Sequence, residues 1–138
     1  MSMPGKDSAG GQATHDVIVR VVSAYMPQES DLSDPLDRKY VFGYHVEIEN
    51  RGARMVKLLS RHWWITDARD EVREVEGEGV VGQQPVIMPG QVFGYSSWCV
   101  ISTPAGRMRG TYSMVTDAGE TIEVPIPRFS LIANAALN

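Results

Sequence analysis

KYVFGYHVEIEN, residues 39–50, is the stretch that decides the fold. Every second position carries an aromatic or branched side chain: Tyr40, Phe42, Tyr44, Val46 and Ile48. A period of two places this set on one face of a strand, and we predict that this face lines the core. Turn residues follow at 50–52, so we expect residues 54–67 to return as the antiparallel hairpin partner.

Further strands are predicted on both sides of this stretch. Residues 17–25 are rich in β-branched side chains, and residues 71–78, 86–88, 91–102, 107–116 and 121–126 read as strands separated by turn signals. We expect the last of these, residues 121–126, to be the final strand and to end before Pro127. Residues 54–67 are less regular, because Leu58–Leu59 and Trp63–Trp64 place apolar groups on both faces. Either both faces are covered or a β-bulge shifts the alternation.

These signals predict an all-β fold, an antiparallel β-sandwich or barrel of seven or eight strands. The 138 residues suit one domain, and 43% hydrophobic and 22% charged residues fit a globular protein. Residues 1–16 are polar and glycine-rich without a secretory signal, so we predict a disordered tail. The single cysteine and the absence of a long apolar run favour a cytoplasmic location away from membranes. A net charge of −4 disfavours nucleic-acid binding.

Several motifs in combination resemble one family. They are LLSRHW at 58–63, ITD at 65–67, GEGVVGQQP at 77–85, PG at 89–90, TPAGRMRGTYSM at 103–114 and IPRFSL at 126–131. Together they resemble the ApaG family, and the likeness spans residues 17–134. The resemblance implies a fibronectin type III-like β-sandwich in small cytosolic proteins that are linked to cobalt resistance and magnesium efflux. It also implies a protein-interaction module without an established catalytic activity. Trp98 stands where the family often has glycine, which predicts a local difference in backbone near Cys99.

The glycine loop, with Gly77, Gly79 and Gly82, matches a dinucleotide fingerprint in spelling. The fingerprint works only where a helix N-terminus follows, and here Pro85 and Pro89 follow instead. A looser anion site on the loop amides stays open as an alternative. The structural interpretation, which we favour, is that these glycines allow a tight crossing between sheets with positive φ.

Metal and nucleophile chemistry have weak support. We expect His45 and His62 to lie on strands that pair, but neither has a second ligand at metal spacing. No metal site and no cofactor are therefore predicted. Cys99 lies in an apolar strand and reads as a small buried hydrophobe. No pair of nucleophile and base is visible, so we expect that the chain is not an enzyme.

The tandem tryptophans suggest a surface. Consecutive residues point to opposite faces, so we assign Trp63 to the core and Trp64, with Arg61 and His62, to a candidate partner surface. The alternative, that both tryptophans are buried, stays open.

Two functions follow from these predictions. The first is a non-catalytic module that binds an unknown protein partner through a sheet edge or loops, with a homodimer through sheet edges as one form. The second is a small anion or divalent-cation binder that uses the loop at residues 77–82.

Overall fold

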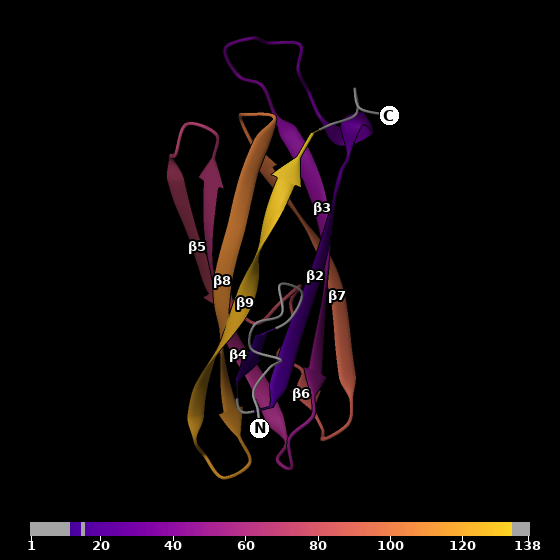
Figure 1. Cartoon of the computed structure of the whole chain (residues 1–138), viewed down its shortest axis with the longest axis vertical. Helices are drawn as coiled ribbons and strands as arrows, with labels where there is room; N and C mark the ends of the chain where they lie inside the picture. Colours follow the sequence, from indigo (N-terminus) through magenta and orange to yellow (C-terminus); the bar gives the residue numbers. More distant parts are fainter. Residues whose placement is uncertain (1–11, 15, 134–138) are drawn as a thin grey trace.

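The structure is a computed structural model, and it describes residues 12–14 and 16–133. Two antiparallel sheets pack face to face as a sandwich (Figure 1). One sheet has the strand order β1-β2-β3-β7, and the other has the order β5-β4-β8-β9 with β6 paired to β4. The predicted fold class, an all-β antiparallel sandwich of the fibronectin type III and immunoglobulin-like kind, is confirmed.

Seven of the strands are long and two are short. The first sheet contains β1 (Gln12–Thr14), β2 (Val17–Tyr25), β3 (Tyr40–Asn50) and β7 (Val92–Ile101). The second contains β4 (Val56–Asp67), β5 (Val72–Glu78), β6 (Val86–Ile87), β8 (Ala105–Thr116) and β9 (Thr121–Ile132). A 3-10 turn, Pro27–Glu29, lies in the loop between β2 and β3.

Strand β3 confirms the predicted core face. Its alternating set, Tyr40 to Ile48, is buried, with Phe42, Val46 and Ile48 fully so. The opposing sheet supplies a matching alternation in β8, where Met108, Tyr112 and Met114 are buried. The two inner faces therefore form one core between the sheets.

The predicted hairpin between β3 and β4 is wrong. Strand β3 pairs with β2 and β7, whereas β4 belongs to the other sheet. The buried Asn50 explains the crossing, because its Nδ2 donates to the carbonyls of Arg54 (2.8 Å) and Ile87 (2.9 Å). These bonds hold a turn that reverses the chain and also carries it from one sheet to the other. The expectation that His45 and His62 lie on paired strands fails for the same reason.

The irregular strand β4 contains the β-bulge that was one of the two alternatives, between Leu58 and Ser60. The bulge restores the alternation, so that Trp63 is buried (2% exposed) and Trp64 is half-buried on the outer face. Leu58 and Trp63 then both reach the core although they are five positions apart.

Two predicted boundaries differ from the structure. Strand β9 continues through Pro127 to Ile132, because a proline is tolerated on an edge strand. Strand β1 extends the first sheet before the boundary predicted at residue 17. The rest of the predicted tail, residues 1–11 and 15, lies outside the described residues.

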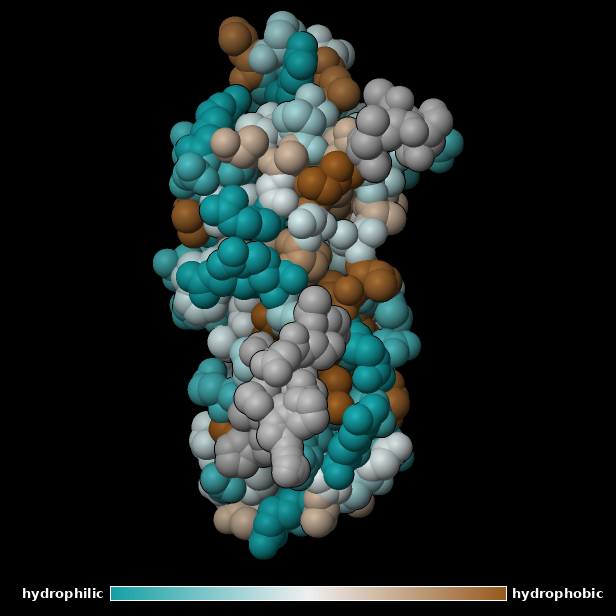
Figure 2. All heavy atoms as spheres, in the orientation of Figure 1, coloured by the Kyte–Doolittle hydropathy of each residue, from teal (hydrophilic) through white to brown (hydrophobic). Residues whose placement is uncertain are grey.

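The outside of the sandwich carries mostly polar groups. On the face seen in Figure 2, apolar atoms form small areas separated by hydrophilic ones. Among residues 12–14 and 16–133, no helix has the length and hydropathy needed to cross a membrane.

Candidate functional site

Strand β7 is an edge strand of the first sheet, and its composition is unusual for an edge strand. It pairs only with β3, and its ten residues, VFGYSSWCVI, include no proline and no charged side chain. Edge strands are normally shortened, charged or interrupted, because their free backbone groups can pair with another chain. Strand β7 has none of these protections.

The free backbone groups of this edge can be identified from one hydrogen bond. The Val100 carbonyl accepts from Arg73 Nη2 at 2.9 Å and so points away from β3. In an antiparallel strand, alternate residues direct both N–H and C=O to the same side. Gly94, Ser96 and Trp98 therefore also present their backbone groups outward, where no strand pairs with them.

The other long edges of the sandwich are protected. Strand β9 carries Pro125 and Pro127, and Ser23 Oγ on β2 donates to its Ser130 carbonyl at 2.8 Å, which closes that side. Strand β5 carries a charged residue at four of seven positions. Among the strands that the structure describes, only β7 is an edge that is both long and unprotected.

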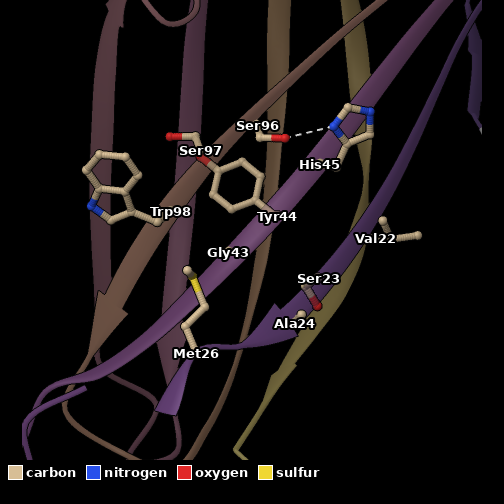
Figure 3. Close-up of a pocket in the computed structure, with 10 residues that line it drawn as sticks. All are labelled: Val22, Ser23, Ala24, Met26, Gly43, Tyr44, His45, Ser96, Ser97 and Trp98. Atoms are coloured by element: carbon tan, nitrogen blue, oxygen red, sulfur yellow. Dashed lines mark hydrogen bonds between the residues drawn. The ribbon is translucent and has the colours of Figure 1, made fainter. Parts of the chain in front are cut away.

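A hollow lies beside this edge on the outer face of the sheet. It has a volume of about 500 Å³, and residues from β2, β3 and β7 surround it (Figure 3). Gly43 has no side chain, and a Cβ there would lie 3.0 Å from Met26 Sδ. A second hollow of about 390 Å³, lined by Met26, Val41, Trp98, Val100 and Glu29, adjoins it.

Trp98 belongs to both hollows and is 71% exposed. Val22 and Met26, which line the first hollow with Trp98, are 69% and 37% exposed, and the three form the apolar patch of this hollow. Trp98 pairs with Gly43 in regular register and does not have positive φ. The difference from relatives that was predicted near Cys99 stays a prediction.

Polar groups border the patch. His45 Nδ1 lies 2.9 Å from Ser96 Oγ, a contact drawn in Figure 3. The His45 ring lies against Gly94, where a Cβ would come within 3.3 Å of Nε2. Further along the face, Arg20 pairs with Glu49 at 3.1 Å and Glu47 at 3.6 Å. A charged rim around an apolar centre is typical of interaction surfaces.

Two arginines lie on the inner side of the same margin. Arg73 reaches from β5 to the Val100 carbonyl of β7, and Arg61 Nη1 donates to the carbonyls of Glu78 (3.1 Å) and Gly79 (2.9 Å). Gly77 makes room for Arg61, because a Cβ there would lie 2.9 Å from the guanidinium. Both guanidinium groups thus lie at the gap between β5 and β7, where Asp37, Asp67 and Glu71 also line a hollow beside Arg73.

Burial and these charges act in opposite directions on nearby groups. Burial raises the pKa of the Cys99 thiol to about 11, and the Arg73 charge opposes that rise. Burial also raises the pKa of the Tyr95 phenol, against the Arg61 charge. Cys99 is therefore a protonated, buried thiol, as predicted, and not an activated nucleophile.

The predicted glycine loop forms a tight turn. Val81 (φ 42°) and Gly82 (φ 79°) are its two central residues, and Val80 and Gln83 exchange backbone hydrogen bonds of 2.8 Å across it. The Gly79 amide donates to the Leu59 carbonyl. Three loop amides therefore already have partners within the chain. No helix follows, and the positive φ values match the structural interpretation of the glycines.

The predicted partner surface is divided between two faces. His62 and Trp64 stack on the outer face of the second sheet, with ring centroids 3.8 Å apart, and the Arg109 guanidinium lies 4.3 Å above Trp64. Arg61 points inward instead, to the carbonyls of Glu78 and Gly79. The structure brings Arg61 together with Gly77 and Gly79, and not with Trp64.

The two described histidines lie on outer faces of different sheets. His62 has a glutamate oxygen 2.9 Å from each ring nitrogen, from Glu74 and Glu76. Within the part of the chain that the structure describes, no group of three or more His, Cys, Asp or Glu side chains could hold a metal ion.

The sequence interpretation missed the site at β7. One signal was present: Phe93, Tyr95, Ser97, Cys99 and Ile101 alternate as the inner set, which leaves Trp98 on the outer face. What the sequence did not show is that β7 is an edge, because that depends on which strands pair.

Comparisons with known proteins complete the description. A family model described as the ApaG domain matches residues 30–116. A protein called ApaG from Caulobacter vibrioides is 50% identical over 128 residues, covering 92% of this chain and 89% of that protein. Another from Rhodospirillum centenum is 48% identical over 120 residues, covering 87% and 90%. The crystal structure of an ApaA protein from Bordetella pertussis superposes with a TM-score of 0.79 at 47% identity, covering 87% of this chain and 95% of that one.

Proposed function

This chain belongs to the ApaG domain family, and we propose that it is a non-catalytic protein-interaction module. Its partner is a protein with an extended segment that adds to the β7 edge as a further strand. Strand addition supplies affinity through main-chain hydrogen bonds and specificity through alternate side chains.

One observation carries this proposal: β7 is a ten-residue edge without proline or charge, whereas β9 carries two prolines and β5 carries four charged residues. Leaving such an edge exposed risks association with other chains. A bound partner strand would satisfy the outward groups of Gly94, Ser96 and Trp98 and remove that risk.

The Trp98 patch supports the same partner. Side chains of an added strand alternate between the two faces, so those on the outer face would lie beside Trp98 and its hollows. An exposed tryptophan next to a concave apolar surface is a frequent centre of binding energy. A hydrophobic side chain of the partner fits this position.

The link of relatives to cobalt resistance and magnesium efflux is, in this proposal, an effect of the partner. Two of the described candidates already have charged partners, since His62 pairs with Glu74 and Glu49 pairs with Arg20. A cytoplasmic location stays a prediction.

The test blocks the edge without disturbing the fold. In Ser96→Pro the amide that is removed points outward and donates to no strand of the chain, so the domain should fold. Ser96→Ala is the matched control, since both variants lose the contact with His45. Peptides of nine residues are selected by phage display on the wild-type chain, and their affinities are measured for all three proteins.

We expect selected peptides to lose at least about tenfold in affinity on Ser96→Pro and little on Ser96→Ala. They should shift the backbone amide resonances of Gly94, Ser96 and Trp98. Peptides that bind both variants equally, or that shift only resonances of the second sheet, would contradict the proposal. A wild-type dimer that Ser96→Pro dissociates would identify a second copy as the occupant in place of a partner protein.

A further inference from the structure

The geometry of the β7 edge also indicates what the partner segment contains. A residue opposite Ser96 or Trp98 on an added strand points to the outer face, beside the apolar patch. A residue opposite Tyr95, Ser97 or Cys99 points inward, toward the gap between β7 and β5. The two sets of partner side chains thus meet different surroundings.

The inward positions meet two guanidinium groups. Arg73 lies beside Cys99 and donates to the Val100 carbonyl. Arg61 lies beside Gly77, and its charge opposes the rise in the pKa of the Tyr95 phenol. Neither arginine forms an ion pair with any described residue, since both bond to backbone carbonyls. A guanidinium has five donors, so each retains N–H groups for a further acceptor.

Two carboxylates of β5 point away from the gap. Glu74 and Glu76 alternate with Arg73 on β5 and contact His62 on the outer face of the second sheet. Asp37, Asp67 and Glu71 line a hollow together with Arg73, but no described carboxylate forms an ion pair with Arg73 or Arg61.

The spacing of the two arginines completes the argument. On β5, Arg73 is four residues from Gly77, the residue against which the Arg61 guanidinium lies. On β7, Cys99 is four residues from Tyr95. Four residues of a strand span about 13 Å. Two carboxylates four positions apart on an added strand would match both guanidinium groups.

We propose that the β7 edge recognises an extended acidic segment, with two aspartate or glutamate residues four positions apart and apolar residues on the alternate face. This proposal rests on the proposed function and names the chemistry of its partner. Carboxylates would bond to the arginines in the gap, while the apolar side chains lie beside Trp98.

Three blocked heptapeptides test the inference by fluorescence anisotropy and by amide shifts. The first is Val-Glu-Val-Thr-Val-Glu-Val, the second has glutamine in place of both glutamates, and the third has its glutamates three positions apart, on opposite faces. We expect the first to bind the full chain at least about tenfold more tightly than the second and more tightly than the third. The preference should decrease as salt rises from 0.05 to 0.5 M.

Arginine variants locate the effect. Arg73→Gln and Arg61→Gln should each reduce the preference for glutamate over glutamine about threefold. Arg128→Gln, an exposed arginine on β9, is the matched control and should leave the preference unchanged. Arg73 is the safer variant, because Arg61 also holds the glycine loop.

The outcomes separate the two proposals. Equal binding of the glutamate and glutamine peptides, with shifts at Ser96 and Trp98, overturns the acidic partner and leaves strand addition in place. An undiminished preference in both arginine variants also overturns it, as does failure of all three peptides to bind. Failure of strand addition itself appears instead as unaffected binding of selected peptides to Ser96→Pro.

Discussion

Two tyrosine hydroxyls join the sheets in the middle of the core, and their removal gives a sharp test of how the sandwich is held. Tyr95 Oη on β7 and Tyr112 Oη on β8 lie 2.5 Å apart. Both residues are buried, Tyr112 completely. The perturbation is to replace each tyrosine by phenylalanine, singly and together.

The expected magnitudes follow from which hydroxyl is left without a partner. Tyr95→Phe leaves the hydroxyl of Tyr112, at 0% exposure, without a hydrogen-bond partner. This variant should lower the free energy of unfolding by about 2–3 kcal/mol. Tyr112→Phe leaves the hydroxyl of Tyr95, at 7% exposure, without a hydrogen-bond partner. It should lower the free energy of unfolding by about 2 kcal/mol, since some solvation of that hydroxyl remains. The double variant has neither hydroxyl, so no polar group is left without a partner, and its free energy of unfolding should fall by ~1 kcal/mol or less.

The assay is guanidinium unfolding followed by tryptophan fluorescence, with the midpoint compared at constant slope. A second readout is pH. Burial raises the pKa of both phenols, so above pH ~10 the unfolded chain releases protons that the folded chain retains. The stability of the wild type should fall there, and the double variant should fall less. A double variant that loses the sum of the two single losses, within about 0.5 kcal/mol, would refute the reasoning.

Four further predictions concern other parts of the chain. Val81→Asn should stabilise by ~1 kcal/mol in a denaturant melt, because Val81 is β-branched at φ 42° and Asn-Gly suits this turn; Val81→Ile should not. Gly79→Ala should cost more than ~2 kcal/mol, since its Cβ would lie 2.3 Å from the Gln83 carbonyl at φ 66°, and a neutral thermal melt would contradict this. The Cys99 thiol has a folded pKa of about 11 against an ordinary 9, so its contribution is present below pH 9 and is lost between pH 9 and 11; Cys99→Ala should flatten unfolding free energies across that window. Phe42→Ala should cost ~3–5 kcal/mol, and an unchanged melting temperature would show that the core face is assigned wrongly.

The strands themselves were predictable because alternation is a local property. The set from Tyr40 to Ile48 shows its buried face in the sequence, and the structure confirms it. Likewise, Leu58–Leu59 and Trp63–Trp64 indicated an irregularity that proved to be a bulge. These features depend only on the alternation of side chains within each strand.

Strand pairing was less predictable because it depends on distant residues. The turn after Asn50 shows where the chain reverses, but the bond from Asn50 to Ile87, 37 positions away, determines that it changes sheets. The same limit hid the candidate site. Trp98 is an ordinary strand residue until β7 is known to be an edge, and Arg61 looks like a neighbour of Trp64 until the bulge and Gly77 direct it inward.

The prolines of β9 have a consequence for how copies of this chain could aggregate. A fibre grows only if every added molecule offers two receptive margins, one for each neighbour. Here the proline-bearing strand β9 and the glutamate-rich strand β5 are poor templates, so two molecules joined along their β7 strands would offer no other long, unprotected edge among the described strands. Under the proposed function, the domain would keep one edge free for a partner while self-association would stop at a dimer.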